Sequence, residues 1–445
     1  MPQQSTGSEE LFQKVPTRII RMATVICMIA GIVAVFDFIL FGTLLPRISE
    51  SFGWSTSEAL LVSTLVSVGT AIVLFTMGPL VDKIGRRKGM ITTVLGTAVS
   101  SAASAAATGA TSLVGVRAIG GLSLAEQSIN ATYLNELYNA AEDKRVTRNR
   151  GFVFSMVQTG WPLGALTAAL FVAFMGAVLG IEDWRWIFLI ATAPALLVAW
   201  WCRKLPETPQ FLAQKVSRAT AAQQKTKTQS FLIFRRPYLK TTLFLGSAWM
   251  FNWMSIQTFS VLGTTVLETG KGFSATNSLL MVAASNLVAV LGYLAHGWLG
   301  DRFDRRKVIA VGWLIAAALF TAMLLGPNNT VFVLVTYMTG LFFLLGPYAT
   351  MLVYQSEAYP TECRATGGAF AFAMSQPGAI LGGLFLTIVT AAGLNYTMAA
   401  LVVGSGACLI SGIIMISART HRKSPSMVAS GPPEEEKDLL TAPAK

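Results

Sequence analysis

"GPLVDKIGRRK", residues 78–88, decides the fold, because a close copy of it, "GWLGDRFDRRK", occupies residues 297–307. Charged residues make up only 13% of the chain, yet five of them crowd into seven positions of the first copy. Each matching residue of the second copy follows its counterpart by 219 positions, about half of the 445-residue chain. This spacing predicts that the chain consists of two related halves.

Two further pairs of segments recur in the same order and at nearly the same spacing. The recurring residues, each with its later counterpart, are Glu136 and Glu357, Tyr138 and Tyr359, Phe154 and Phe372, Met156 and Met374, and Gln158 and Gln376. Chance is a poor explanation of three matches in order, so we predict two homologous halves. Two such halves within one membrane are the architecture of alternating access, in which they rock about a substrate held between them.

The composition is that of a membrane protein. Hydrophobic residues make up 53% of the chain, and the charged fraction is about half of that in soluble proteins. Apolar runs of about 20 residues, the length that crosses a bilayer as a helix, recur throughout. We therefore predict an all-α membrane protein with twelve transmembrane helices in two pseudo-symmetric six-helix bundles. The predicted helices occupy residues 20–45, 58–80, 89–108, 112–138, 151–179, 184–203, 239–268, 275–299, 307–326, 330–356, 365–392 and 395–417.

Basic residues cluster in alternate loops between the apolar runs, which is the bias of cytoplasmic loops. The net charge of +12 therefore reflects topology and does not indicate a nucleic-acid partner. We expect a multi-pass protein of the plasma (inner) membrane, with both termini cytoplasmic, that acts as a monomer. The predicted segments are a cytosolic tail at 1–18, an N-terminal bundle at 19–203, a cytosolic linker at 204–238, a C-terminal bundle at 239–418 and a disordered cytosolic tail at 419–445.

The chain has four cysteines and two histidines, and none of them shows the spacing of a metal site. It also has no nucleophile or phosphate-loop motif. We therefore expect no catalytic residues, no metal and no cofactor. A membrane sensor with a transporter fold is a different class of protein to consider, but such a sensor would need a signalling module, and the C-terminal tail is short.

The repeated charged segment can form a latch at the inner membrane face. Gly78 lets a neighbouring backbone approach, and Asp82 can accept hydrogen bonds from the free amides of the next helix. Arg86 and Arg87 can pair with Asp82 and with carbonyls at another helix end. The alternative is that these basic residues only anchor the topology. The residues that we expect at this inner gate are Gly78, Asp82, Arg86, Arg87, Glu136, Arg145, Asp301, Arg305, Arg306, Glu357 and Arg364.

The same segment resembles the loop between helices 2 and 3 of the major facilitator superfamily, which reads G-x-x-x-D-[RK]-x-G-[RK]-[RK]. The second copy departs from this pattern at Asp304, where the family usually has glycine, so we expect a different turn there. The resemblance implies a transporter and does not indicate its cargo. The matching positions in the first copy are Gly78, Asp82, Lys83, Gly85, Arg86 and Arg87.

Three charged residues, Asp37, Arg117 and Glu126, lie inside predicted helices, where a charge is costly unless it is paired or hydrated. At about 1.5 Å per residue, Asp37 lies about 12 Å and Arg117 about 8 Å below the outer helix ends, so they could meet. Glu126 follows Arg117 by nine residues and points to the opposite side of a regular helix. Both could face one cavity only if Gly120 and Gly121 distort the helix.

We hypothesise that Asp37 carries the proton. Arg117 favours its charged form, desolvation favours its protonated form, and protonation would free Arg117 for an anionic substrate. The alternative is a structural pair that only joins two helices. Glu126 is either a second protonatable site or a neutral, hydrogen-bonded acid. Ordinary helix packing is the alternative role for the remaining substrate-binding candidates, which are Gln158, Trp161, Asn252, Gln257, Tyr337, Tyr348 and Gln376.

Two stretches are similar to proton symporters of organic acids. "FDFILFGTLLP" at 36–46 resembles their helix-1 signature, and Asp37 matches the second acid of the Asp-Gly-x-Asp pattern of aromatic-acid symporters. Ala34 and Val35 replace the first acid and the glycine. "RAIGGLSLAEQSINATYLNE" at 117–136 is similar to helix 4 of aromatic-acid, sialate and metabolite symporters. These resemblances imply proton-coupled uptake of a small organic anion, an aromatic or other monocarboxylate, across the lipid bilayer.

Other stretches keep alternative cargoes open. "LPETPQFL" at 205–212 and "YPTECRATGG" at 359–368 are shared with sugar and organic-cation porters, so a sugar or polyol symporter is an alternative. An efflux antiporter is a further alternative. However, "GWPLGAL" at 160–166 does not match the G-P-x-x-G-G pattern of drug antiporters, which favours uptake.

Overall fold

The computed structural model describes residues 14–143, 145, 153, 156–180, 183–213, 233–236, 238–359 and 364–417. These residues form an all-helical protein with one isolated β-bridge, which joins Val15 to Ala141. The predicted all-α fold class is confirmed.

The helices of the first half overlap the predicted apolar runs, although their bounds differ in places. α1 is longer than predicted, because it continues through Pro46 until Gly53 adopts a left-handed conformation with φ of 68°. Ser55 and Glu58 form a reciprocal capping box at the start of α2. The helices are α1 (Thr17–Phe52), α2 (Thr56–Ile84), α3 (Arg86–Ser104), α4 (Ala110–Ile119), α5 (Leu122–Asn139), α8 (Gly160–Ala177) and α9 (Trp184–Cys202).

The second half contains more interruptions than the first. The amide-lacking Pro347 separates α15 from α16, as expected of proline within a helical run. The elements are α11 (Leu239–Ile256), η2 (Gln257–Val261), α12 (Gly263–Thr265), η3 (Val266–Gly270), α13 (Ala275–Arg302), α14 (Arg305–Leu325), α15 (Thr330–Leu345), α16 (Pro347–Glu357), α17 (Arg364–Ala373), α18 (Ser375–Ala391), α19 (Tyr396–Ala400), η4 (Leu401–Ser405) and α20 (Gly406–Ser417).

Several helices that we predicted as continuous are interrupted in the structure, and two of these interruptions stand out. The predicted helix 112–138 divides at Gly120 and Gly121 into α4 and α5. The predicted helix 239–268 contains the π-helical segments η2 and η3, a geometry that often marks functional sites. Both breaks lie in helices that carry candidate site residues.

Within the described residues, nine helices are long and apolar enough to cross a membrane. The other three spans of the twelve-helix arrangement are α3, the pair α4 and α5, and the run from α11 to η3. α3 is rich in serine and threonine, and the other two spans are interrupted, so length and hydropathy alone do not identify them.

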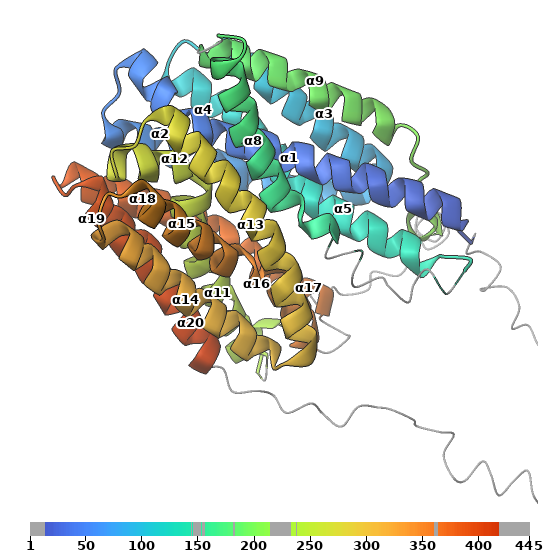
Figure 1. The fold of residues 1–445 in the computed structure, drawn as a ribbon. Helices are drawn as coiled ribbons and strands as arrows, with labels where there is room; N and C mark the ends of the chain where they lie inside the picture. Colours follow the sequence, from blue (N-terminus) through green and yellow to red (C-terminus); the bar gives the residue numbers. More distant parts are fainter. Residues whose placement is uncertain are drawn as a thin grey trace, which may run out of the picture.

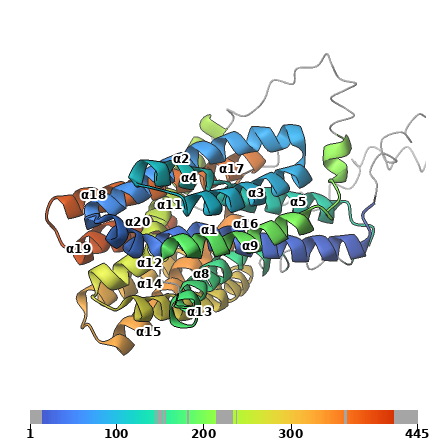
Figure 2. The same ribbon diagram turned by 90° about the horizontal axis from the view of Figure 1, so that it is seen from above.

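The helices form two bundles that follow the two halves of the sequence. In Figure 1, α1 to α9 run from the upper left to the lower right, whereas α11 to α20 run from the upper left to the bottom. Seen from above in Figure 2, the helices of both bundles run roughly from left to right. Because each half crosses six times, the start of α1, the end of α9 and the start of α11 share one side. We call it the linker side and the opposite side the far side.

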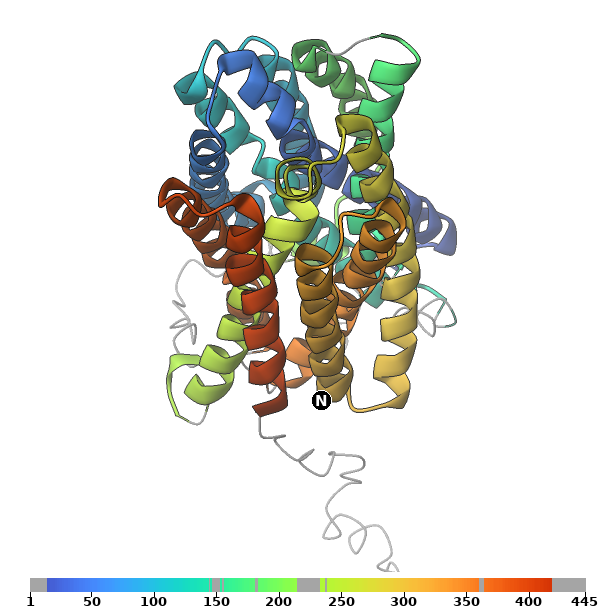
Figure 3. The ribbon, with the colours of Figure 1, turned by 60° about the vertical axis from the view of Figure 1, so that its left-hand side comes forward.

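The bundles are in close contact on the far side. A Cβ atom added to Gly42 of α1 would lie 3.0 Å from the carbonyl carbon of Val261 and nearer still to its oxygen. The Thr264 hydroxyl donates to the carbonyl oxygens of Gly42 and Thr43 at 3.3 and 3.2 Å. Figure 3 shows the yellow-green segment containing α12 between the two bundles. A glycine at position 42 allows this approach, which closes the far side.

Candidate functional site

Asp37 of α1 and Arg117 of α4 form a buried ion pair, as their predicted depths indicated. Nη2 of Arg117 lies 3.2 Å from Oδ2 of Asp37 and also donates to the Asp37 main-chain carbonyl at 2.9 Å. Ser101 of α3 donates its hydroxyl hydrogen bond to the other carboxylate oxygen. Both charged side chains are only about 3–4% exposed. Three helices therefore hold one compensated charge pair inside the first bundle.

Aromatic rings surround the Arg117 guanidinium. Its Cζ lies 5.6 Å from the ring centre of Phe41 and 5.2 Å from that of Phe188, within the range of cation–π attraction. Nε of Arg117 is buried and has no hydrogen-bond partner among the described residues. The guanidinium thus has unused hydrogen-bonding capacity in addition to its pair with Asp37.

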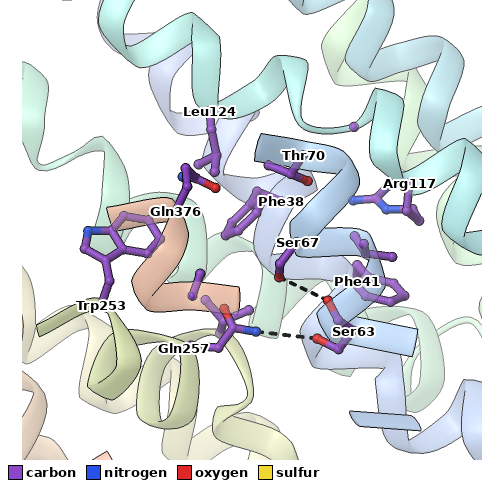
Figure 4. Close-up of a pocket in the computed structure, with 14 residues that line it drawn as sticks. Phe38, Phe41, Ser63, Ser67, Thr70, Arg117, Leu124, Trp253, Gln257 and Gln376 are labelled. Carbon is purple, nitrogen blue, oxygen red and sulfur yellow. Dashed lines mark hydrogen bonds between the residues drawn. The ribbon is translucent and has the colours of Figure 1, made fainter. Parts of the chain in front are cut away.

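Arg117 lines a central pocket of about 450 Å³, counting the space open to solvent. Figure 4 shows Arg117 at one side of this pocket and Trp253 with Gln376 at the other. Gln257 donates to the Ser63 hydroxyl across the boundary between the bundles at 3.4 Å. The pocket combines a cation, aromatic rings and amides. Its lining residues are Phe38, Phe41, Ser63, Val66, Ser67, Thr70, Arg117, Gly120, Leu124, Trp253, Gln257, Val261, Gln376 and Ala379.

Three predicted substrate-binding residues, Arg117, Gln257 and Gln376, line this pocket, and other members of its lining were missed. The hydroxyls of α2 recur at positions 63, 67 and 70, which is the spacing of one helix face. That polar stripe within an apolar run was the signal that could have identified them. Trp253 and Phe38 gave no such signal, since aromatic residues are common throughout these helices.

Two predicted residues, Gln158 and Trp161, line a second cavity in the first bundle, which measures about 260 Å³ when the space open to solvent is counted. This cavity belongs to α1, α5 and the start of the fifth span. We call it the amide cavity. Its lining residues are Gly31, Val35, Gln127, Asn130, Val157, Gln158, Gly160 and Trp161.

The remaining predicted substrate residues, Asn252, Tyr337 and Tyr348, are not among the residues that line either cavity. The Tyr337 hydroxyl donates to the Phe259 carbonyl at 2.6 Å, so this side chain supports the π-helical segment η2. Tyr348 packs edge-on against Trp249, with ring centres 5.1 Å apart. In this conformation the contacts of the two tyrosines are those of helix packing, which was the stated alternative. The buried Nδ2 of Asn252, in contrast, has no hydrogen-bond partner within the described residues.

Glu126 of α5 lies apart from the central pocket. Its side chain is fully buried beside the Asn130 amide, and neither carboxylate oxygen makes a hydrogen bond of good geometry within the described residues. The break at Gly120 and Gly121 does not bring it into the lining that contains Arg117. Arg117 and Glu126 therefore have different surroundings.

On the linker side of the first bundle, Arg86 joins Asp82 and Glu136. Its Nη1 lies 3.3 Å from Asp82, and its Nε lies 3.1 Å from Glu136. Arg87 donates to the carbonyl of Arg203 at the end of α9, as expected for a latch between helix ends. Gly78 lies within α2.

The expected cap of the following helix needs a correction. Glu207 of the linker, and not Asp82, accepts hydrogen bonds from the first amides of α3, those of Arg86 and Arg87, at 2.9 and 3.2 Å. Gly85, with φ of 98°, lets the chain turn between α2 and α3 beneath this carboxylate. Asp82 instead uses its carboxylate to pair with Arg86.

The second copy of the segment has the same ion pairs and a different turn. Arg305 pairs with Asp301 at 2.9 Å and with Glu357. Asp304 caps α14 by accepting from the amides of Arg306 and Lys307 at 2.9 and 3.3 Å. Because the capping acid, Asp304, is part of the turn itself, no glycine is needed at that position. The turn therefore differs from that of the first copy, as expected from the sequence. Both clusters of ion pairs lie within one bundle each.

Two expected gate residues have little structural support. Arg145 is exposed, and its main-chain amide donates to Asp143. Arg364 begins α17, and its side chain lies outside the described part of the structure. Within the described residues, no group of three His, Cys, Asp or Glu side chains could hold a metal ion.

Comparison with known proteins agrees with this architecture. The family model described as "Major Facilitator Superfamily" matches residues 27–383 and 253–442. The chain is 26% identical to a putative niacin/nicotinamide transporter of Bacillus subtilis, covering 83% of this chain and 89% of the relative. It is 24% identical to a gallate transporter of Pseudomonas putida, covering 91% and 93%, and 26% identical to a 4-hydroxybenzoate transporter of Acinetobacter baylyi, covering 85% and 86%.

A solved structure shows the same fold. The crystal structure of a D-xylose–proton symporter superimposes with a TM-score of 0.69, covering 89% of this chain and 97% of that chain at 18% identity. The family match extends over most of the sequence, and the repeated charged segment and the two six-helix bundles accompany it. This protein belongs to the Major Facilitator Superfamily of membrane transporters.

Proposed function

We propose that this transporter takes up a small aromatic carboxylate together with protons. The observation that carries the proposal is the buried pair of Asp37 with Arg117, whose guanidinium lines an aromatic pocket between the bundles. A carboxylate cargo suits this position because it can replace Asp37 as the anionic partner of Arg117.

The pair supplies a route for coupling. When Asp37 is protonated, it no longer compensates the charge of Arg117. The guanidinium can then bind the carboxylate of the cargo. When the cargo leaves, the unpaired cation favours the charged form of Asp37, and the proton is released. Since an unpaired charge at this depth costs several kcal/mol, states that carry only a proton or only an anion are disfavoured.

The pocket lining supports an aromatic cargo. Phe38, Phe41 and Trp253 offer ring faces and edges, and Gln257 and Gln376 offer hydrogen bonds to ring substituents. The relatives named for niacin, gallate and 4-hydroxybenzoate are named for aromatic compounds.

The linker side is cytoplasmic in this proposal, and the protein lies in the plasma membrane. Basic residues crowd the linker side at residues 83–88, 203–204 and 302–307, as the orientation rule requires of cytoplasmic loops. The closed far side is then the outer face. The two ion-pair clusters around Arg86 and Arg305 stiffen the cytoplasmic ends of their own bundles, so that each bundle moves as a unit.

Glu126 stays protonated and neutral in this proposal. A charge on its carboxylate would have no ion-pair partner among the described residues in this conformation, because the group is buried beside the neutral amide of Asn130. Asp37 then carries the proton alone, and Glu126 contributes to packing in the interior of the first bundle.

Asp37→Asn tests the coupling role. The full-length protein is reconstituted into vesicles, and uptake of labelled benzoate, 4-hydroxybenzoate and nicotinate is measured with and without an imposed pH gradient. We expect the variant to lose gradient-driven accumulation and to retain exchange of labelled for unlabelled cargo, because the amide cannot release a proton. Undiminished accumulation would show that Asp37 does not couple transport to protons.

A neutral polyol is the second candidate cargo, since the two glutamines of the pocket could bind hydroxyl groups without Arg117. Unlabelled xylose and sorbitol are therefore added as competitors in the same assay. If they compete and the carboxylates do not, the anion proposal is wrong while the transporter assignment stands.

A further inference from the structure

The amide cavity differs from the central pocket in its chemistry. Three of its lining side chains are carboxamides, those of Gln127, Asn130 and Gln158, and none of its lining residues is charged. Such a lining does not compensate a carboxylate. It can instead exchange hydrogen bonds with a neutral hydroxyl, carboxamide or ring nitrogen, because a carboxamide both donates and accepts.

Two polar atoms in this lining have no partner among the described residues. Nε2 of Gln127 and Oδ1 of Asn130 are buried and make no hydrogen bond. The Asn130 side chain is only 2% exposed, and its Nδ2 donates to the Cys27 carbonyl at 2.6 Å, which fixes the orientation of the amide group. Buried polar groups are nearly always satisfied in native proteins. Oδ1 of Asn130 can accept from the neighbouring Glu126 carboxyl when that group is protonated, whereas Nε2 of Gln127 implies a polar partner in the cavity.

Two glycines form part of the cavity wall. Gly31 of α1 and Gly160 of α8 let the two helix backbones approach closely there, since a Cβ added to Gly160 would lie 3.4 Å from the carbonyl carbon of Gly31. A Cβ added to Gly31 would reach 3.6 Å from Nδ2 of Asn130, which is ordinary contact. A methyl group at position 31 would therefore narrow the cavity without a clash.

Trp161 separates the two cavities. Its ring centre lies 5.4 Å from that of Trp253 and 5.9 Å from that of Phe38, and both of these residues line the central pocket. Trp161 itself lines the amide cavity, and its indole N–H donates to the Ser260 hydroxyl of the second bundle at 3.3 Å. The partition between the cavities is thus tied to the contact between the bundles.

The amide cavity also lies closer to the linker side than Arg117 does. Asn130 follows Arg117 by 13 residues along a span that runs from the far side to the linker side. This separation corresponds to at most about 20 Å at 1.5 Å per residue, because the span is interrupted at Gly120 and Gly121. A cargo that moves inward from Arg117 would therefore encounter Trp161 and then the carboxamides.

We propose that the amide cavity is a second cargo subsite, which binds the uncharged hydrogen-bonding substituent of the cargo after it has passed Trp161. The proposal rests on the proposed function for the direction of transport and for the aromatic carboxylate. It adds that a cargo with a ring hydroxyl, carboxamide or ring nitrogen is preferred over its unsubstituted parent, and that residues far from Arg117 set this preference.

The test compares benzoate, 4-hydroxybenzoate and 4-carbamoylbenzoate as cargoes of the reconstituted full-length protein. We expect the wild type to favour the two substituted acids. Gln127→Leu should reduce that preference about tenfold, and Gly31→Ala should reduce it similarly by narrowing the cavity while keeping every polar group. Gln210→Leu, a matched substitution in the linker outside both linings, should leave the preference unchanged.

Three outcomes would overturn the proposal. The first is a wild type that does not prefer the substituted acids over benzoate. The second is that the variants keep this preference, because only water satisfies the carboxamides. The third is that the variants lose uptake of all three acids equally. Arg117→Gln separates this failure from failure of the proposed function. If that variant binds the acids as tightly as the wild type, the carboxylate assignment is wrong, while dependence of xylose or sorbitol binding on Gln127 would still support the amide cavity.

Discussion

Gly42→Ala should shift the transporter toward the state that is open on the far side. The added methyl group would lie within 3.0 Å of the Val261 carbonyl, whereas ordinary contacts begin near 3.4 Å. α1 and η2 must therefore separate, and the Thr264 hydrogen bonds to the carbonyls of Gly42 and Thr43 must lengthen beyond their present 3.3 and 3.2 Å.

The free-energy penalty of Gly42→Ala in the closed state can be estimated from these contacts. Overpacking of this kind costs about 1–3 kcal/mol, and the weakened hydrogen bonds add to that figure. The penalty applies only while the far side is closed, because the two helices separate when it opens. Since 1.4 kcal/mol corresponds to a factor of ten, the population ratio should move about 5- to 150-fold toward the far-open state.

The assay is accessibility of a reporter cysteine at Ser63, which is only 3% exposed in the closed structure. The native cysteines are replaced by serine, and a membrane-impermeant maleimide is added from outside. Labelling of Ser63→Cys should become faster in the Gly42→Ala background, and net uptake should fall. Gly115→Ala is the matched control, because a Cβ there meets nothing within 4 Å. Unchanged labelling and uptake in Gly42→Ala would refute the role of this contact in closing the far side.

The remaining predictions concern the other buried acid and the helix caps. Glu126→Gln should retain proton-driven uptake to within about twofold, because a neutral amide can replace a neutral carboxyl, and loss of accumulation in the vesicle assay would instead assign it a proton. Glu207→Ala and Asp304→Ala should each destabilise the protein by about 1 kcal/mol, because each removes the acceptor for the first amides of one helix. Thermal unfolding in detergent measures this loss, and a larger effect of Asp82→Ala than of Glu207→Ala would contradict the assignment of the α3 cap.

The central ion pair was accessible to sequence analysis because depth in a membrane helix follows from counting residues. Asp37 and Arg117 lie at similar depths in two apolar runs, and a buried charge needs a partner, so their contact could be predicted. The Ser101 hydrogen bond could not, since nothing in α3 distinguishes that serine from Ser100 or Ser104. Which face of a helix meets a neighbour depends on how the helices pack.

The cap of α3 shows a similar limit. Asp82 is adjacent in sequence to the free amides and was the natural candidate, yet the structure places Glu207 there from more than 100 residues away. Asp304, in contrast, is both adjacent and the observed cap. Predicting that the acidic residue nearest in sequence caps a helix is therefore sound only where no distant segment folds onto the same helix end.

The sequence by itself determined the membrane class, the two-fold repeat, the transporter family and the depth of the buried charges, because hydropathy and spacing are properties of the linear chain. Only the tertiary structure decided which side chains share a cavity. Gln158 and Gln376 occupy equivalent positions in the two halves, yet one lines the amide cavity and the other the central pocket. The difference arises because the bundles meet through unlike surfaces, with glycine contacts and π-helical turns that set the approach of the helices.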